Sequence, residues 1–490
     1  MSFRIVVVIA ASGLLAVACS TVDSDTSPAV TVAPSSLGTT VPGPPADTAL
    51  VPPATTATAR NQAGYAFPPA PATESGPTSP SLANDIDALL TGIEISVNPD
   101  TIRSIGRQGD PRAAWLLADI LRFVGPGEAR QAIIGAFEDL TGALLAEDPI
   151  APRSPWQSMT DHLIAWDLPS LDRYREWKGR LFTAIDPRWS PFFSDEDATI
   201  DYRWLGWGGV LIDDRPLGTA QPCVRGCIPA LDDPVVTDAS GGDWYPDDAI
   251  VFGVVVNGEA RAYPKNIMEV HEMINDSLGG RRLGIPYCTL CGSAQAYFTD
   301  GVPPGVEVPV LRTTGLLSRS NKVMYDLVTA SVLDTFTGAA VSGPLLDAGI
   351  ILEQAPVVTS TWGAWKADHP DTTVVAEDGG IGRIYDPDPL GGRDDNGPIF
   401  PIGDVDRRLA PQAKVLGVIV DGNAVAFDVE TARAALAAGQ RVEAAGVVVV
   451  ADGSGVRAER DDGTPIGGHE AFWFAWSQFH PTTDLWTVIP

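Results

Sequence analysis

The residues best suited to chemistry in this chain lie between positions 271 and 293. Cys288 and Cys291 are separated by two residues, and the pair His271-Glu272 stands shortly before them. Thiolates and imidazoles bind thiophilic metals, and two thiols at this spacing can also cycle between dithiol and disulfide. The cluster therefore predicts either metal binding or thiol redox chemistry.

The leading hypothesis is a metal site with Cys288, Cys291 and His271 as ligands. Copper is favoured, because thiolates and imidazole suit a soft ion. Met324 is a candidate for a further soft ligand, and Glu272 for a carboxylate that ligates the ion or orients the imidazole. Zinc is the weaker choice, because a closed structural zinc site takes four protein ligands.

Two other interpretations compete with the metal site. Cys288 and Cys291 could form a thiol-disulfide oxidoreductase centre in which His271 or Glu272 moves protons. Alternatively, Cys288–Cys291 and Cys223–Cys227 are two structural disulfides of a non-catalytic envelope scaffold. A third arrangement joins all four cysteines in one tetrathiolate site.

The elements around the cluster are predicted from spacing. Pro264 can open a helix that ends at Gly279-Gly280, because one stripe at helical spacing holds Ile267, Val270, His271, Ile274 and Leu278. Residues 282–287 are typical of a strand, 288–293 of a turn and 294–298 of the next strand. Such a helix, strand and turn would bring His271 near the thiols.

An internal duplication surrounds this cluster. The stretch from Val251 to Tyr263 reappears from Val415 to Phe427, and each copy is an apolar strand, an Asn-Gly or Asp-Gly turn and a returning strand. These turns predict β-hairpins. Only the first copy is followed by the histidine and the cysteines. The first half is therefore expected to contain the reactive site, and the second half to have a structural role.

These patterns predict an α+β chain, with a small all-α domain followed by a duplicated, mainly antiparallel β-rich domain with short helices. Residues 81–213 form the helical part, where apolar runs over 113–123 and 129–145 resemble a HEAT-like pair. The β-rich part covers 214–490, with halves at about 223–375 and 376–490. Several tryptophans of the helical part are expected to serve packing: Trp156, Trp166, Trp177 and Trp189.

The N-terminus is typical of an exported protein. Arg4, a short apolar run and small residues before Cys19 form a signal peptide over 1–19, and Cys19 is the candidate lipidation site. Residues 20–80 are rich in Pro, Thr, Ala and Ser and are expected to be a disordered tether. The expected location is extracytoplasmic, with a lipid anchor as the membrane contact.

Composition excludes several function classes. Sixty-two acidic against 33 basic residues give a formal net charge of −29, which opposes binding to nucleic acid. The chain has no Gly-x-Ser-x-Gly elbow, no phosphate-binding Gly-rich loop and no His-Glu-x-x-His motif. One acidic loop has calcium-binding residue types without EF-hand spacing, and is expected to be solvated: Asp386, Asp388, Asp394 and Asp395.

The motif run around the cysteines resembles the bacterial DUF3179 family, a domain of unknown function. The resemblance is carried by Gly-Glu-Ala-Arg-Ala-Tyr-Pro from position 258, His-Glu, Asn-Asp, Gly-Gly and Tyr-Cys-x-x-Cys-Gly-Ser. It continues through Phe336-Thr-Gly to Phe472-Trp-Phe-Ala-Trp476, and covers roughly 228–486. The resemblance implies an exported or membrane-linked domain, and it does not imply any particular activity. The Cys223–Cys227 pair departs from the family pattern, which favours glycine-rich turns there.

Together these features predict a lipid-anchored envelope protein that binds a thiophilic metal for metal handling or electron transfer. A thiol oxidoreductase and a scaffold are the alternatives. The helical domain is a candidate surface for a protein partner, and the oligomeric state is not determined by the sequence.

Overall fold

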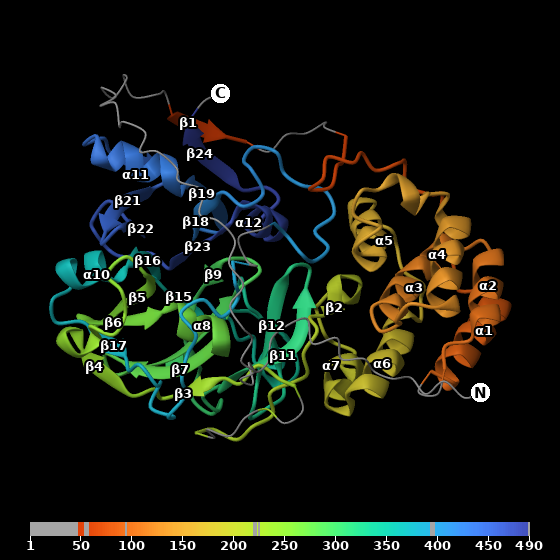
Figure 1. Ribbon diagram of the computed structural model, residues 1–490, viewed down its shortest axis with the longest axis horizontal. Helices are drawn as coiled ribbons and strands as arrows, with labels where there is room; N and C mark the ends of the chain where they lie inside the picture. Colours follow the sequence, from red (N-terminus) through yellow and green to blue (C-terminus); the bar gives the residue numbers. More distant parts are fainter. Residues whose placement is uncertain are drawn as a thin grey trace, which may run out of the picture.

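The computed structural model describes residues 48–52, 58–93, 96–218, 223, 226–392 and 397–488. Cys19, the predicted signal peptide, Asp394 and Asp395 lie outside these residues. The predicted α+β class is confirmed, because helices dominate the first part of the described chain and mostly antiparallel sheets follow (Figure 1). Within the described ranges, no helix has the length and apolar content that crossing a bilayer requires.

Several helices of the N-terminal part begin with the same local signal. Ser79, Asn98 and Ser154 each precede a proline, and each side chain accepts a hydrogen bond from a backbone N–H of the first turn. The cap satisfies an otherwise unpaired donor, and the proline has the φ angle of a helix. The α-helices are α1 (Pro80–Thr91), α2 (Pro99–Arg107), α3 (Ala114–Leu121), α4 (Glu128–Thr141), α5 (Pro155–Ala165), α6 (Tyr174–Ile185) and α7 (Ser190–Ser194).

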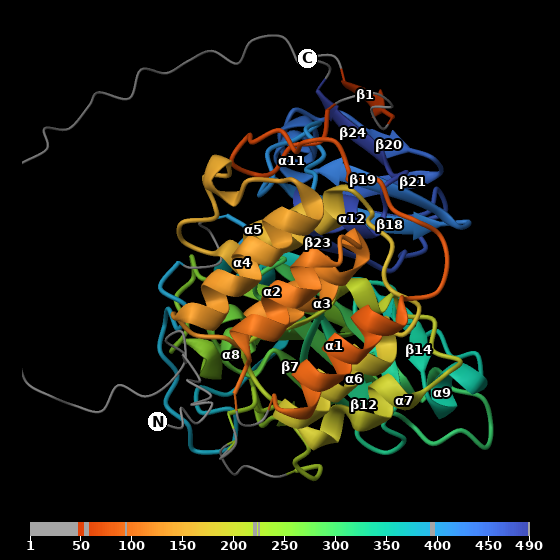
Figure 2. The ribbon, with the colours of Figure 1, turned by 90° about the vertical axis from the view of Figure 1, so that its right-hand side faces the viewer.

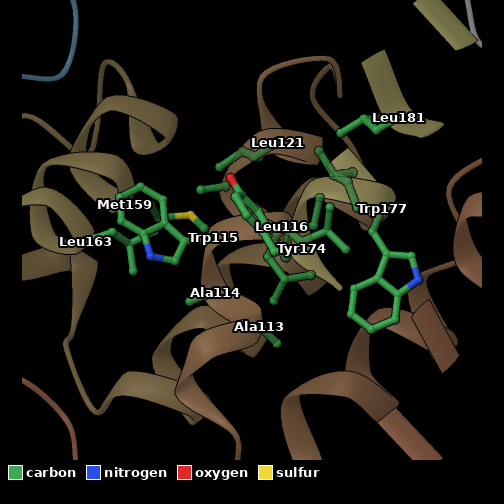
Figure 3. Close-up of a cluster of buried hydrophobic side chains, with 14 of the residues drawn as sticks. Ala113, Ala114, Trp115, Leu116, Leu121, Met159, Leu163, Tyr174, Trp177 and Leu181 are labelled. Carbon is green, nitrogen blue, oxygen red and sulfur yellow. The ribbon is translucent and has the colours of Figure 1, made fainter. Parts of the chain in front are cut away.

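Large aromatic side chains fill the core of this helical region (Figure 3). Trp115 is 1% exposed and donates from Nε1 to Leu168 O at 2.7 Å. Trp177 and Trp189 are fully buried, which confirms their predicted packing role. Trp156 and Trp166 are half-buried.

Residues 58–79 belong to the fold, although the sequence pattern placed them in a tether over 20–80. The Asn61 side chain is buried and donates from Nδ2 to Asp148 Oδ1 at 2.9 Å. The strand β1 (Thr48–Val51) pairs with the last strand of the chain. Composition alone predicts a solvated chain here, and it misses these contacts because both involve residues far away in the sequence.

Two sheets of the β-rich part repeat one arrangement. The first has the order β16-β5-β6-β17-β4, and the second β23-β18-β19-β24-β1. In each, a hairpin (β5–β6 or β18–β19) is flanked by an antiparallel strand and a parallel strand. The strands are β4 (Val236–Asp238), β5 (Ile250–Val256), β6 (Glu259–Pro264), β16 (Val358–Thr361), β17 (Thr373–Val375), β18 (Lys414–Val420), β19 (Asn423–Asp428), β23 (Gly468–Phe472) and β24 (Asp484–Val488).

A short helix follows the flanking strand in both sheets, α10 (Trp362–Asp368) after β16 and α12 (Trp473–Phe479) after β23. Trp365 packs on Gly253 and Trp476 on Gly417, so closely that a Cβ atom would stand 2.3 and 2.1 Å from the ring. Both glycines are thus required by the indole above them. The duplication seen in two hairpins therefore extends through the helices and the flanking strands.

In the β-rich part, one turn of each half also extends onto the other half. The turn after β8 (Arg281–Cys288) reaches the second half, where Phe472 N donates to Cys291 O at 2.8 Å. The turn after β21 (Val447–Asp452) reaches the first half, where Thr361 N donates to Ser454 Oγ at 2.8 Å. Phe472 and Thr361 hold the same place, directly before α12 and α10.

Three further sheets complete the β-rich part, ordered β15-β10-β8-β7-β3 with β9 beside β8, β14-β13-β12-β11-β2, and β20-β21-β22. Their other strands are β2 (Leu205–Trp207), β3 (Leu231–Asp232), β7 (Met273–Leu278), β9 (Ser293–Ala294), β10 (Ala296–Phe298), β11 (Leu311–Ser318), β12 (Asn321–Asp326), β13 (Val332–Asp334), β14 (Ala340–Ser342), β15 (Glu353–Ala355), β20 (Val442–Ala444) and β22 (Gly455–Glu459). The remaining helices are α8 (Lys265–His271), α9 (Pro344–Asp347) and α11 (Val429–Ala437).

The helical region packs on the sheet that contains β11 and β12 (Figure 2). Its hydrophobic core continues into Leu316, Val323 and Tyr325 of these strands. The strand β2, which follows the helices, pairs with β11. This junction matters for chemistry because β12 also delivers residues to the cysteines.

Candidate thiol site

The structure changes the predicted path of the chain before the cysteines. The helix α8 ends at His271, and Glu272 adopts a left-handed conformation with φ of 51°. Residues 273–278 then form the strand β7 in place of the predicted helix to Leu278. Ile274 and Leu278 fit the alternation of a strand as well as the period of a helix, and pairing with β8 and β3 decides between the two.

The sharp end of α8 sends His271 and Glu272 to different surroundings. His271 Nδ1 lies 2.6 Å from Pro229 O, and Nε2 lies 2.7 Å from the Tyr385 hydroxyl. Both ring nitrogens are thus occupied away from the cysteines. Among the described residues, His271, Cys288 and Cys291 do not bring their ligand atoms within 4.8 Å of one another. The expected three-ligand metal site is therefore not assembled.

His271 gives this arrangement a measurable pH dependence. Burial lowers its pKa to about 4, so the folded protein keeps the ring neutral while an unfolded histidine takes up a proton near pH 6.5. Stability from this group is complete above pH 6.5 and is lost as the pH falls toward 4. We expect the gap in unfolding free energy between wild type and His271→Gln to narrow by about 3 kcal/mol from pH 7 to pH 4. Urea titrations at both pH values test this, and a gap that stays constant would contradict it.

Cys288 and Cys291 themselves lie side by side as free, buried thiols. Cys288 ends β8, and Cys291 follows in the turn, where the Cys291 Sγ atom lies 3.3 Å from Ser320 O. Gly292 closes the turn with φ of 57°, and a Cβ atom there would collide with Phe472. The predicted strand, turn and strand around the cysteines are confirmed, apart from a break at residue 295 between β9 and β10.

Lys322 of β12 supplies a positive charge to this pair. Its Nζ atom lies 2.7 Å from Glu272 Oε2 and donates to Glu272 O at 2.7 Å. Thr289 Oγ1 donates to Glu272 Oε1 at 3.2 Å. Glu272, predicted as a metal or proton-transfer residue, thus anchors Lys322 beside the thiols.

The two thiols differ in acidity. Burial raises the pKa of Cys288, but the hydrogen bond from Cys291 and the charge of Lys322 outweigh it, so the pKa lies below its ordinary value. Burial and the neighbouring Cys288 raise the pKa of Cys291 well above its ordinary value. Cys288 is therefore the more acidic of the two thiols and the one that ionises first. A thiolate is the nucleophilic form of cysteine.

A cavity of about 70 Å³ opens onto one of the two thiols. Cys288, Thr289, Glu272 and Lys322 are among its polar lining residues, and Phe400 is among its apolar ones. Cys291 is not among the lining residues. A molecule in the cavity therefore contacts Cys288 rather than Cys291.

Other residues singled out in the sequence have packing or supporting roles. Met324 is fully buried in a separate apolar cluster with Leu333. Asp276 accepts hydrogen bonds from Arg261 at 2.6 Å and Tyr263 at 2.9 Å. Lys322 is the residue of the candidate site that the sequence analysis missed. A lysine directly before the apolar residues Val323 and Met324 was the available signal.

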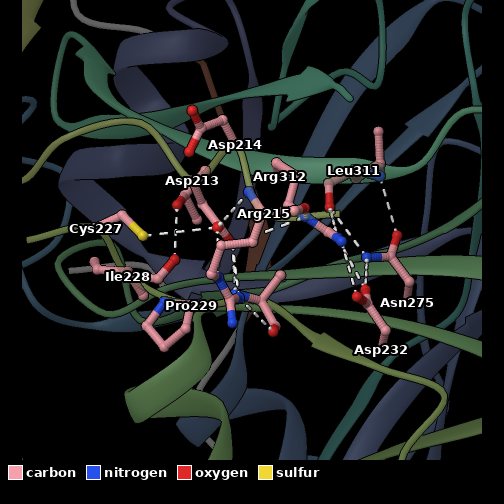
Figure 4. A network of polar contacts seen from close by, with 12 residues as sticks. Asp213, Asp214, Arg215, Cys227, Ile228, Pro229, Asp232, Asn275, Leu311 and Arg312 are labelled. Atoms are coloured by element: carbon pink, nitrogen blue, oxygen red, sulfur yellow. Dashed lines mark hydrogen bonds and ion pairs between the residues drawn. The ribbon is translucent and has the colours of Figure 1, made fainter. Parts of the chain in front are cut away.

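Cys223 and Cys227 form a disulfide with Cα atoms 5.3 Å apart. Their sulfur atoms and an Asp213 oxygen lie within 4.8 Å of one another, the one such group of potential metal ligands in the described ranges. Figure 4 shows Cys227 and Asp213 of this group. Asp213 Oδ1 accepts from Arg215 Nε at 2.7 Å, and Arg312 lies 3.8 Å from Oδ2. A triad for a metal is present, but the two arginines oppose a cation and the disulfide would first have to be reduced.

Comparison with known families agrees with the motifs. Residues 225–464 match the family described as "Protein of unknown function (DUF3179)". The match supports the DUF3179 assignment. It spans β3 to β22 and includes the thiol turn, Lys322 and Cys227, whereas Cys223 and the Phe472–Trp476 motif fall outside it. No curated protein and no solved structure matches the chain.

Proposed function

We propose that the DUF3179 region carries a redox-active thiol pair, Cys288 and Cys291, which cycles between dithiol and disulfide. The observation that carries this proposal is the asymmetry of the pair. Cys288 lines the cavity together with Lys322 and has the lowered pKa, whereas Cys291 does not line the cavity and has the raised pKa. Redox-active cysteines commonly divide the work in this way, with one attacking thiol and one resolving thiol.

The chemistry of one turnover balances within the pair. Cys288 attacks an oxidised centre of the substrate and forms a bond to it, and that centre loses its leaving group. Cys291 then attacks Cys288 Sγ, which forms the Cys288–Cys291 disulfide and releases the reduced substrate. Two electrons pass from the pair to the substrate, together with one proton from Cys291 and one from solvent. An external dithiol then returns the pair to its starting state.

Metal binding by the same thiols is the second candidate function. It is supported by two adjacent sulfur atoms, which suit a Cu(I) ion better than a zinc ion. It is opposed by the Lys322 ammonium next to the thiols and by the engagement of His271 elsewhere. The redox pair therefore accounts for more of the surrounding groups.

We also propose an extracytoplasmic location, with a lipid on Cys19 as the membrane contact. The Cys223–Cys227 disulfide supports it, because such bonds persist in oxidising compartments. A protein partner for the helical region remains a prediction from the sequence.

The test is a redox titration of the full-length chain. The protein is equilibrated in mixtures of reduced and oxidised dithiothreitol, the free thiols are alkylated, and the peptide with Cys288 and Cys291 is weighed by mass spectrometry. We expect a reversible change between two alkylated thiols and none, lost in Cys288→Ser and in Cys291→Ser. The matched control is the double variant Cys223→Ser/Cys227→Ser, which should keep the transition.

Metal content of the same proteins separates the two candidates. The reduced chain is incubated anaerobically with Cu(I) or Zn(II), desalted and analysed for metal. A bound metal that disappears in Cys288→Ser/Cys291→Ser, combined with no reversible disulfide, would replace the redox proposal with the metal site. Metal that disappears only in Cys223→Ser/Cys227→Ser would assign the Asp213 triad instead.

A further inference from the structure

The size of the cavity limits what can reach Cys288. Its volume is about 70 Å³. A buried water needs on the order of 10–15 Å³ of such space, so the cavity holds about five waters. A molecule of a few heavy atoms fills this space, whereas oxidised glutathione or a disulfide on another protein is much larger. With Cys288 only 2% exposed, a bulky oxidant has no direct contact with the thiolate.

The polar groups of the cavity are gathered next to the thiolate. A lysine ammonium has three N–H donors. Among the described residues, two of those of Lys322 reach Glu272, at Oε2 and at the main-chain oxygen. One donor is left for a ligand. Thr289 Oγ1 donates to Glu272 and keeps its lone pairs for a ligand in the cavity.

Much of the remaining lining is apolar. It includes Val210, Ile228, Leu316 and Phe400. The occupant must therefore be small, must have a polar end for Lys322, and must have an atom that accepts electrons from sulfur. A molecule with two bonded oxygens meets all three requirements.

We infer that the oxidant of the thiol pair is a small hydroperoxide, with hydrogen peroxide as the simplest member. The inference rests on the proposed redox function and adds the class of substrate to it. Lys322 is placed to hold the oxygen that leaves, Cys288 to attack the other oxygen, and Cys291 to complete the reaction.

The reaction balances with the groups present. The Cys288 thiolate attacks one peroxide oxygen, so an S–O bond forms and the O–O bond breaks. The second oxygen leaves as hydroxide beside the Lys322 ammonium and takes a proton from solvent. Cys291 then attacks the Cys288 sulfenic acid, the S–S bond forms, and the S–O oxygen leaves as water with the Cys291 proton. One peroxide and two thiols thus give one disulfide and two waters.

The experiment is a single-turnover reaction of the reduced full-length chain with hydrogen peroxide. The reaction is stopped by alkylation at set times, and disulfide formation is followed by mass spectrometry. We expect a rate at least about tenfold above that of free cysteine at pH 7, because Lys322 stabilises the Cys288 thiolate and can hold the oxygen that leaves. Cys291→Ser should accumulate a sulfenic acid on Cys288 that dimedone traps, and Cys288→Ser should give none.

Size selectivity supplies a second readout. Cumene hydroperoxide has the same reactive group on a bulky ring and should react at least about tenfold more slowly than hydrogen peroxide, since the cavity holds only a few heavy atoms. Phe400→Ala enlarges the cavity and should narrow this difference. Equal rates for both peroxides in the wild type would overturn the assignment of the cavity as the entry site.

The outcomes distinguish this inference from the proposed function. A pair that cycles in dithiothreitol buffers but reacts with hydrogen peroxide no faster than free cysteine would overturn the peroxide and leave the redox pair standing. A pair that does not cycle in those buffers would overturn both.

Discussion

Replacing Arg312 with methionine should lower the free energy of unfolding by about 3–5 kcal/mol, because it leaves the buried Asp232 carboxylate without its cation. The Arg312 side chain is fully buried and holds Asp232 through two hydrogen bonds of 2.9 and 2.8 Å (Figure 4). Its Nε atom lies 3.8 Å from Asp213, which is also fully buried. Urea denaturation of the variant and the wild type measures the loss.

The matched control is Arg103→Met in the helical region. Arg103 is 43% exposed and pairs with Asp100 and Glu128 at the surface. Exposed pairs contribute about 0–1 kcal/mol, so this variant should lose little stability. Similar losses for Arg312→Met and Arg103→Met would contradict the buried network as a stabilising feature.

Removing the charge of Lys322 should slow the reaction of Cys288 with iodoacetamide at pH 7 by about tenfold, since each unit of pKa changes the thiolate fraction by that factor. Lys322 is the cation that lowers the Cys288 pKa, so Lys322→Met raises it. The rate is followed from pH 5 to 10 in a Cys291→Ser background, where one thiol of the pair remains. Its midpoint should move to higher pH.

Lys322→Arg keeps the charge and should restore most of the rate. Glu272 loses its partner in Lys322→Met, so thermal unfolding is measured in parallel to show that the variant is folded. An unchanged pH midpoint in a folded Lys322→Met protein would remove Lys322 from the site.

Part of the fold could be predicted from short stretches of neighbouring residues. The Asn-Gly and Asp-Gly turns at 257–258 and 421–422 produced the two hairpins, with positive φ at both residues of each turn. Each of these turns depends on two neighbouring residues, so the sequence alone was sufficient to predict it.

The candidate site could be predicted only in part. Its cysteines were found because the Cys-x-x-Cys spacing is local, whereas Lys322 arrives from β12 and Phe400 from a loop far along the chain. His271 was misplaced because Glu272 takes a left-handed conformation without being glycine, which no local rule indicates. Long-range pairing of β7 with β8 and β3 determines that bend, and the sequence does not encode such pairing in a readable pattern.

The reciprocal turns of the β-rich part have a consequence for its symmetry. Two identical subunits that exchange a segment form a two-fold dimer, and each mutation then appears in both of its sites. In this protein the two halves that exchange turns belong to one chain, so the two turns can have different sequences. One carries Cys288 and Cys291, while its counterpart carries Asp452 and Ser454, and Ser454 holds the first half in place. Because both halves lie in one chain, the protein can have a single reactive centre. A homodimer that exchanges the same segment would have two.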